Sequence, residues 1–149
     1  MPAVSFRYIV DDVDRAIDFY TRHLGFEVQM HPGPGFAALA RDDFRLYLNA
    51  TGGSGGASQT MPDGSVPEPG GWNRIQIEVD DLVATAGKLR NAGVRTRSDI
   101  IEGQGGKQLV LEDPSGNPVE LFEPKSGVAK RADRSRGLTG RLSPPREWW

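Results

Sequence analysis

Polar side chains of the kinds that bind ligands recur at every second position of four extended segments. Successive side chains of a strand point to opposite faces, so these residues are predicted to share one face of a sheet. The residues on this face are Ser5, Arg7, Ile9, Arg45, Tyr47, Asn49, Arg74, Gln76, Glu78 and Glu120. Arginine, tyrosine and amide side chains, with few lysines, favour a concave surface that contacts a ligand. The alternative is a face that meets only water, as in many half-buried antiparallel sheets.

Aromatic and loop residues extend this set of candidates. Tyr47, Trp72 and Phe36 can stack on the flat parts of a ligand. A glycine-rich run that ends at Lys107 and Gln108 can bring backbone N–H groups and both of these side chains to a ligand. The run is a weak candidate for a phosphate-binding loop, because it precedes a strand whereas nucleotide-binding loops precede a helix. Its alternative interpretation is the approach to an ordinary hairpin.

Two copies of one sequence pattern carry these residues. The pattern RYIVDDVD, a helical stretch and LGF is repeated as RIQIEVDDL, a helical stretch and AGV. Further extended stretches follow in each copy, at residues 35–40 and 44–49 and at residues 107–112 and 118–122. Residues 50–71 between the copies are rich in Gly, Ser and Pro, which indicates a linker or a long functional loop. Two such modules predict an α+β fold with helices covering one face of the sheet.

Each copy contains one amphipathic helix with recognisable ends. Apolar residues at helical spacing predict the buried stripes Val13, Ala16, Ile17, Tyr20 and Leu24 in the first helix and Leu82, Val83, Ala86 and Leu89 in the second. Asp11 or Asp12 is the expected cap of the first helix, and Asp81 that of the second. Gly25 and Gly93 are the expected terminators, because glycine adopts the left-handed conformation without strain.

The composition of the 149 residues excludes several kinds of site. The chain has no cysteine, which excludes disulfides, thiolate nucleophiles and cysteine metal sites. Of its two histidines, His23 is expected in the last turn of the first helix, and His31 in a loop at the rim of a site. No apolar run approaches the roughly 20 residues of a membrane span, so we expect a cytoplasmic protein with no membrane partner.

The charge divides the chain into an acidic body and a basic tail. Residues 1–124 carry 11 Lys and Arg against 18 Asp and Glu, a net charge of −7, whereas residues 125–149 carry 7 against 2, a net charge of +5. The body is expected to form one domain, with a first module at 1–50, a linker at 51–71 and a second module at 72–124. The tail is predicted to be disordered. Because the acidic body opposes nucleic acid, no nucleic-acid partner is expected.

The paired modules resemble the vicinal oxygen chelate superfamily, which includes glyoxalase I, bleomycin-resistance proteins, fosfomycin-modifying transferases and extradiol dioxygenases. The resemblance covers residues 4–124 and rests on the segments VDDVDRAIDFYTRHLGFEV, IEVDDLVATAGKLRNAGV and LEDPSGNPVELFEP. It implies two tandem βαβββ modules that form a curled mixed sheet around a cavity, with the helices on the outer face. It also implies a homodimer.

Metal-dependent members of this family bind a divalent ion at four equivalent positions. The resemblance places these positions at Ser5, Tyr47, Arg74 and Glu120, of which only Glu120 is a plausible ligand. A stable site needs about three suitable ligands. Arg74 is a permanent cation that would repel a metal and would pair with Glu120 instead. We therefore expect neither a metal nor a cofactor.

Binding without turnover is the favoured function. The resemblance implies a protein similar to the bleomycin-resistance members, which sequesters an anionic or aromatic natural product or metabolite. The predicted ligand contacts are Ser5, Arg7, Arg45, Tyr47, Asn49, Trp72, Arg74, Gln76, Lys107, Gln108 and Glu120.

Catalysis remains an alternative to binding. Glu120 would be the general base of a metal-free isomerase or lyase acting on a carbonyl compound. Arg74 or Tyr47 would then stabilise an enolate oxygen. In another interpretation Glu120 and Arg74 form a buried ion pair that only orders the sheet. A metal-dependent glyoxalase-type or dioxygenase-type enzyme is the least favoured alternative.

Overall fold

The computed structural model describes residues 4–53 and 56–125. These residues form two compact units, one comprising 4–53, 56–75 and 112–119 and the other 76–111 and 120–125. The boundary between the units falls inside three strands of the second module. The predicted single domain therefore stays a prediction, and the predicted tail lies outside the described residues except for Lys125.

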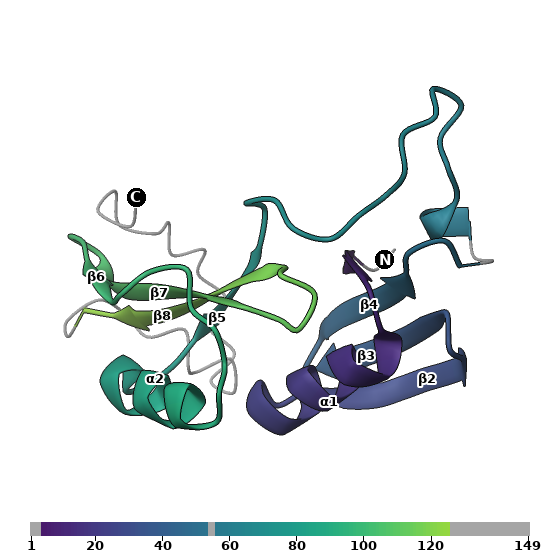
Figure 1. The fold of residues 1–149 in the computed structure, drawn as a ribbon. Coiled ribbons are helices and arrows are strands. Elements are labelled where there is room, and N and C mark those ends of the chain that lie inside the picture. Colours follow the sequence, from purple (N-terminus) through teal and green to yellow (C-terminus); the bar gives the residue numbers. More distant parts are fainter. Residues whose placement is uncertain (1–3, 54–55, 126–149) are drawn as a thin grey trace, which may run out of the picture. The chain divides into compact units, whose positions relative to one another are not determined.

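The first module has the order strand, helix and three strands. Its elements are β1 (Ser5–Val10), α1 (Val13–His23), β2 (Glu27–Gly33), β3 (Phe36–Arg41) and β4 (Phe44–Ala50). The sheet order is β1-β4-β3-β2, with β1 and β4 parallel and the other pairs antiparallel. Helix α1 lies along one face of this sheet (Figure 1). The sheet and the helix bury an apolar core that includes Val10, Val13, Leu39, Leu46 and Leu48.

The second module repeats this order. A short 3-10 helix, η1 (Gly56–Ser58), precedes it, and its elements are β5 (Ile75–Glu78), α2 (Leu82–Asn91), β6 (Ile101–Glu102), β7 (Gly106–Glu112) and β8 (Pro118–Pro124). The sheet order β5-β8-β7-β6 repeats that of the first module. The prediction of an α+β fold built from two tandem modules is confirmed, whereas the cavity stays a prediction. No helix among the described residues is long and apolar enough to cross a bilayer.

The helix ends follow from the sequence, whereas the buried stripes follow it only in part. Asp12 caps α1 by accepting a hydrogen bond from the Arg15 N–H at 3.1 Å, and Asp81 caps α2 in the same way. Two stripe predictions need correction. Ile17 is only half-buried and Phe19 takes its place in the core, while Val83 is 59% exposed. The spacing of apolar residues predicts which face of a helix is buried, but it does not show how far the sheet that covers this face extends.

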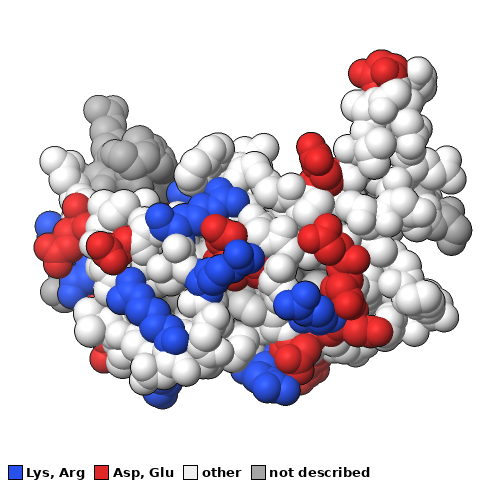
Figure 2. Space-filling model, in the orientation of Figure 1, with Lys and Arg blue, Asp and Glu red and all other residues white. Residues whose placement is uncertain are grey.

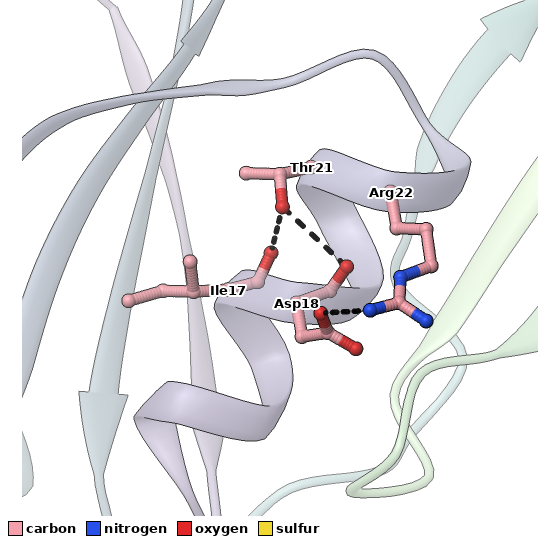
Figure 3. A network of polar contacts seen from close by, with 4 residues as sticks. All are labelled: Ile17, Asp18, Thr21 and Arg22. Atoms are coloured by element: carbon pink, nitrogen blue, oxygen red, sulfur yellow. Dashed lines mark hydrogen bonds and ion pairs between the residues drawn. The ribbon is translucent and has the colours of Figure 1, made fainter.

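The outer surface of α1 carries contacts that stabilise only the helix itself (Figure 3). Thr21 Oγ1 donates to the Ile17 carbonyl oxygen at 2.7 Å, and Arg22 pairs with Asp18 at 2.9 Å, one turn away. Both charged side chains are mostly exposed, so the pair contributes about 0.3–0.5 kcal/mol. This surface is therefore a source of control substitutions.

A buried polar turn joins β7 to β8. The Asp113 carboxylate accepts hydrogen bonds from the Tyr20 hydroxyl, the Ser115 N–H, and the backbone N–H and side-chain amide of Asn117, all between 2.8 and 3.0 Å. Asn117 also donates to the Ile9 carbonyl oxygen at 2.7 Å. Burial raises the pKa of Asp113. The turn thereby holds residues 112–119 against β1 and α1 within the first unit.

Candidate functional site

The register of the first sheet sets polar residues beside small and apolar ones on the face opposite the core. The register places three rows of neighbouring residues across β1, β4, β3 and β2, in that order. The first row is Ser5, Arg45, Ala40 and Glu27. The second row is Arg7, Tyr47, Ala38 and Met30, and the third is Ile9, Asn49, Phe36 and Gly33. We call these twelve residues the ligand face. Leu39, Leu46 and Leu48 alternate with them and are fully buried on the other side. The predicted alternation of β1 and β4 is confirmed.

Arg7 is the best-positioned cation of the ligand face. Its Nη1 donates to Asn49 Oδ1 at 2.7 Å, and its guanidinium carbon lies 5.3 Å from the centroid of the Tyr47 ring. Asn49 is only 3% exposed, so its amide is a fixed anchor, whereas Arg7 itself is exposed. A guanidinium held in one plane by a hydrogen bond and a cation–π contact loses less side-chain entropy when it binds an anion.

Tyr47 lies at the centre of the ligand face with cations on both sides. A hydrogen bond with Ser5 lowers the pKa of Tyr47, and a hydrogen bond with Arg45 and the charges of Arg45 and Arg7 lower it further. The Phe36 ring lies 5.8 Å from the Tyr47 ring in a tilted arrangement. The site therefore favours negative charge, because it already stabilises the phenolate form of its own tyrosine.

The corresponding face of the second unit holds a buried carboxylate. Glu120 on β8 is 7% exposed and accepts a hydrogen bond from Gln76 Nε2 on β5 at 2.5 Å. These two predicted site residues are thus brought together. Burial is costly for a carboxylate, and the hydrogen bond from the Gln76 amide offsets part of this cost.

The remaining predicted site residues lie in less distinctive places. Lys107 is opposite Glu102 in the β6–β7 hairpin, with Nζ 4.0 Å from the carboxylate, and Gln108 is opposite Ile101. Because Lys107 and Gln108 are adjacent on β7, their side chains point to opposite faces. This geometry favours the hairpin interpretation for Lys107.

Arg74 and Trp72 lie just before β5. Arg74 Nη1 donates to the Trp72 carbonyl oxygen at 3.1 Å, and Trp72 is 69% exposed. An ion pair between Arg74 and Glu120 stays a prediction.

The four positions that the resemblance assigns to metal ligands hold a donor set that does not fit a divalent ion. Ser5 and Tyr47 are neutral oxygen donors that hydrogen-bond with each other, Arg74 is a cation, and only Glu120 is a carboxylate. Within residues 4–53 and 56–125, no group of three or more His, Asp or Glu side chains is arranged to hold a metal.

Neither histidine belongs to the ligand face as a metal donor. His23 ends α1, as predicted, with its ring 5.6 Å from the Phe19 ring. The loop prediction for His31 was wrong, because this residue lies within β2 and its Nε2 is 3.5 Å from Asp14. Strand β2 is an edge strand with two register shifts, and such a strand tolerates Pro32.

Sequence reasoning missed the apolar half of the ligand face. Ala38, Ala40 and Met30 carry no group that suggests chemistry, so they were not candidates. For Ala38 and Ala40 the available signal was their period-two spacing in the stretch FAALAR, which places them on the face opposite Leu39, whereas Met30 in β2 had no such signal. The long loop before β5 carries acidic residues, which are red in Figure 2, and within this loop Asp63 accepts hydrogen bonds from Ser65.

The model of the Glyoxalase/Bleomycin resistance protein/Dioxygenase superfamily matches residues 3–121, so the chain belongs to this family. It is the vicinal oxygen chelate superfamily whose pattern the sequence resembles.

Several solved structures share the fold. TnmS3, an antibiotic binding protein from Streptomyces sp. CB03234, is 24% identical with a TM-score of 0.63, over 84% of this chain and 98% of that one. The bleomycin-binding protein of Streptomyces verticillus, solved with copper(II)-bleomycin, is 22% identical with a TM-score of 0.55, over 84% and 98%. Lactoylglutathione lyase from Agrobacterium tumefaciens is 18% identical with a TM-score of 0.61, over 83% and 94%. At these identities the likeness concerns the fold, which binding proteins and enzymes share.

Proposed function

We propose that the chain is a small-molecule-binding protein that sequesters an anionic or aromatic natural product or metabolite without converting it. The observation that carries this proposal is the arrangement of Arg7, anchored on Asn49 and stacked on Tyr47, on an exposed sheet face. A guanidinium group beside an aromatic ring recognises a flat, acidic molecule, and this recognition needs no reactive group. The antibiotic-binding and bleomycin-binding proteins of the same fold support a binding role.

Binding and turnover are measured on the same samples. Isothermal titration calorimetry with bleomycin and with anthraquinone-2-carboxylate tests binding, and mass spectrometry of the recovered compound tests conversion. We expect binding of at least one probe and its recovery intact. Arg7→Ala should weaken binding at least tenfold, which corresponds to about 1.4 kcal/mol. Arg22→Ala on the outer surface of α1 is the matched control and should change nothing. Conversion of a bound probe, or equal affinity in the Arg7 variant, would contradict the proposal.

A metal-free isomerase or lyase is the second candidate, favoured by the buried Glu120 and its bond from Gln76. In this role Glu120 would take a proton next to a carbonyl group. The test is formation of S-lactoylglutathione from methylglyoxal and glutathione in the presence of EDTA. Activity that Glu120→Gln abolishes and Glu102→Gln preserves would establish this function, and an inactive wild-type protein would eliminate it for this substrate.

We further propose that the protein acts in the cytoplasm as a homodimer, as the family resemblance implies. Sedimentation equilibrium of the full chain tests the dimer, for which a monomer mass at all concentrations would be decisive against it.

A further inference from the structure

We propose that the ligand face takes a fused aromatic ring system bearing one carboxylate, with the rings over Ala38 and the carboxylate at Arg7 and Arg45. This inference rests on the proposed binding function and adds the ligand's class and orientation. It also makes Ala38 the residue that determines specificity.

The ligand face is divided across its strands by polarity. On β1 and β4 its members are charged or polar except for Ile9, and on β3 and β2 they are small or apolar except for Glu27. A ligand that covers both halves must itself have a polar end and an apolar body. A purely anionic metabolite would leave the apolar half in water, and a neutral ring system would leave the arginines without an anion.

Ala38 has the shortest side chain in the middle row of the ligand face. Its neighbours in the register are Tyr47 on β4 and Met30 on β2, both with long side chains, and Phe36 is two residues along the same strand. Ala38 has only a methyl group and is 7% exposed, whereas Met30 is 55% exposed. The cross-strand neighbours on both sides of Ala38 therefore have larger side chains than its methyl group. Met30 can adapt its shape to a ring edge, because its side chain is unbranched and flexible.

The row of residues from Arg7 to Met30 is long enough for a ligand with more than one aromatic ring. Neighbouring strands lie about 4.8 Å apart, so the three steps from Arg7 to Met30 span about 14 Å. A single benzoate would reach from the arginines only to Tyr47. A fused system of two or three rings continues over Ala38 to Met30 and buries its flat surface there.

The charges orient such a ligand. Arg7 and Arg45 lie on β1 and β4, and the acidic member of the face, Glu27, lies on β2 at the far edge. A carboxylate is therefore attracted to the β1–β4 side and repelled from the β2 side. The bond to Asn49 uses one N–H group of Arg7, and a guanidinium has five to offer a planar acid.

Three probes separate the parts of this inference in calorimetric titrations of the full chain. Anthraquinone-2-carboxylate has rings and acid, 2-hydroxymethylanthraquinone has the same rings without the acid, and benzoate has the acid with one ring. We expect the fused-ring acid to bind at least tenfold more tightly than either of the others. Ala38→Leu should weaken binding of the fused-ring acid at least tenfold and leave binding of benzoate unchanged, because the leucine takes up the space proposed for the rings and leaves the arginines in place.

Ala84→Leu is the matched control, because Ala84 is exposed on α2 and should affect no probe. Met30→Ala is a second variant that shortens an exposed side chain without crowding the sheet. It should weaken binding of the fused-ring acid about threefold or more. If the neutral ring compound binds as well as the acid, or if neither variant weakens the fused-ring acid, the inference is wrong while the binding function stands. If no probe and no bleomycin binds the wild-type protein, the proposed function fails as well.

Discussion

The three tyrosines of the chain should ionise in two well-separated stages, and Tyr47 alone should account for the first. Hydrogen bonds from Ser5 and Arg45 and the nearby arginine charges lower the pKa of Tyr47 below its usual value near 10. Burial raises the pKa of Tyr8 and of Tyr20 above that value, and the Asp113 charge adds to the effect on both. The chain has three tyrosines, so one third of the total tyrosinate absorbance should develop at lower pH than the rest.

Substitutions assign the first stage of this titration. In absorbance at 295 nm, Tyr47→Phe should remove the early third and leave the later two thirds. Ser5→Ala should move the early stage to higher pH, because the Ser5 hydrogen bond is the largest cause of the lowered pKa. Arg22→Ala, on the outer surface of α1, is the control. A single stage near pH 10 for all three tyrosines, or an early stage that persists in Tyr47→Phe, would refute the description of the ligand face.

The shifted pKa values of the three tyrosines also determine how the free energy of unfolding changes with pH. The pKa of Tyr47 is lower in the folded than in the unfolded chain, so its ionisation adds stability as the pH rises through the folded pKa. That contribution is complete above pH 10 and is absent below the folded pKa. The raised pKa values of Tyr8 and Tyr20 act in the opposite direction, since their ionisation above pH 10 favours unfolding. The late two thirds of the absorbance change should therefore coincide with the loss of secondary structure.

Two further predictions concern stability in urea. Asp113→Ala leaves four donors, three of them buried, without their carboxylate and should lower the free energy of unfolding by about 3 kcal/mol or more, whereas Asp63→Ala in an exposed turn should change it by less than about 0.5 kcal/mol. Gly106→Ala should cost at least about 2 kcal/mol, because its φ is +154° and a Cβ atom there would overlap the Glu123 carbonyl group. Gly87→Ala on open helix surface should instead add up to about 1 kcal/mol. Equal effects within either pair would contradict the assigned contacts.

The elements and their faces were predictable because they depend on local rules. Alternation along β1 and β4 placed Arg7 and Tyr47 on one face, since a strand has a period of two residues whatever it packs against. The caps Asp12 and Asp81 were predictable for the same reason, because an aspartate before an apolar stripe satisfies exposed N–H groups locally. These features needed no knowledge of distant contacts.

Features set by distant contacts were not predictable from one sequence. Val83 has helical spacing but lies beyond the edge of the covered surface, so only the packing decides its exposure. His31 lies in a strand because β3 supplies a partner for an edge that contains a proline. Ala38 enters the site through its cross-strand neighbours Tyr47 and Met30, and strand register is not encoded in any one of the segments.

The positive charge of the ligand face can attract an anion in a fold whose assigned metal-ligand positions do not fit a divalent ion. A divalent ion attracts oxygen anions through its own charge, and its removal from such a fold would leave a site with no such attraction. In this chain Arg7 and Arg45 supply positive charge from the first sheet, and Asn49 and Tyr47 hold Arg7 in position. A guanidinium can bind a carboxylate but cannot activate water or polarise a carbonyl group as strongly as a metal does. Arg7 and Arg45 lie outside the four positions assigned to metal ligands, so their attraction for an anion does not depend on a metal, and this attraction is the physical basis of the proposed binding function.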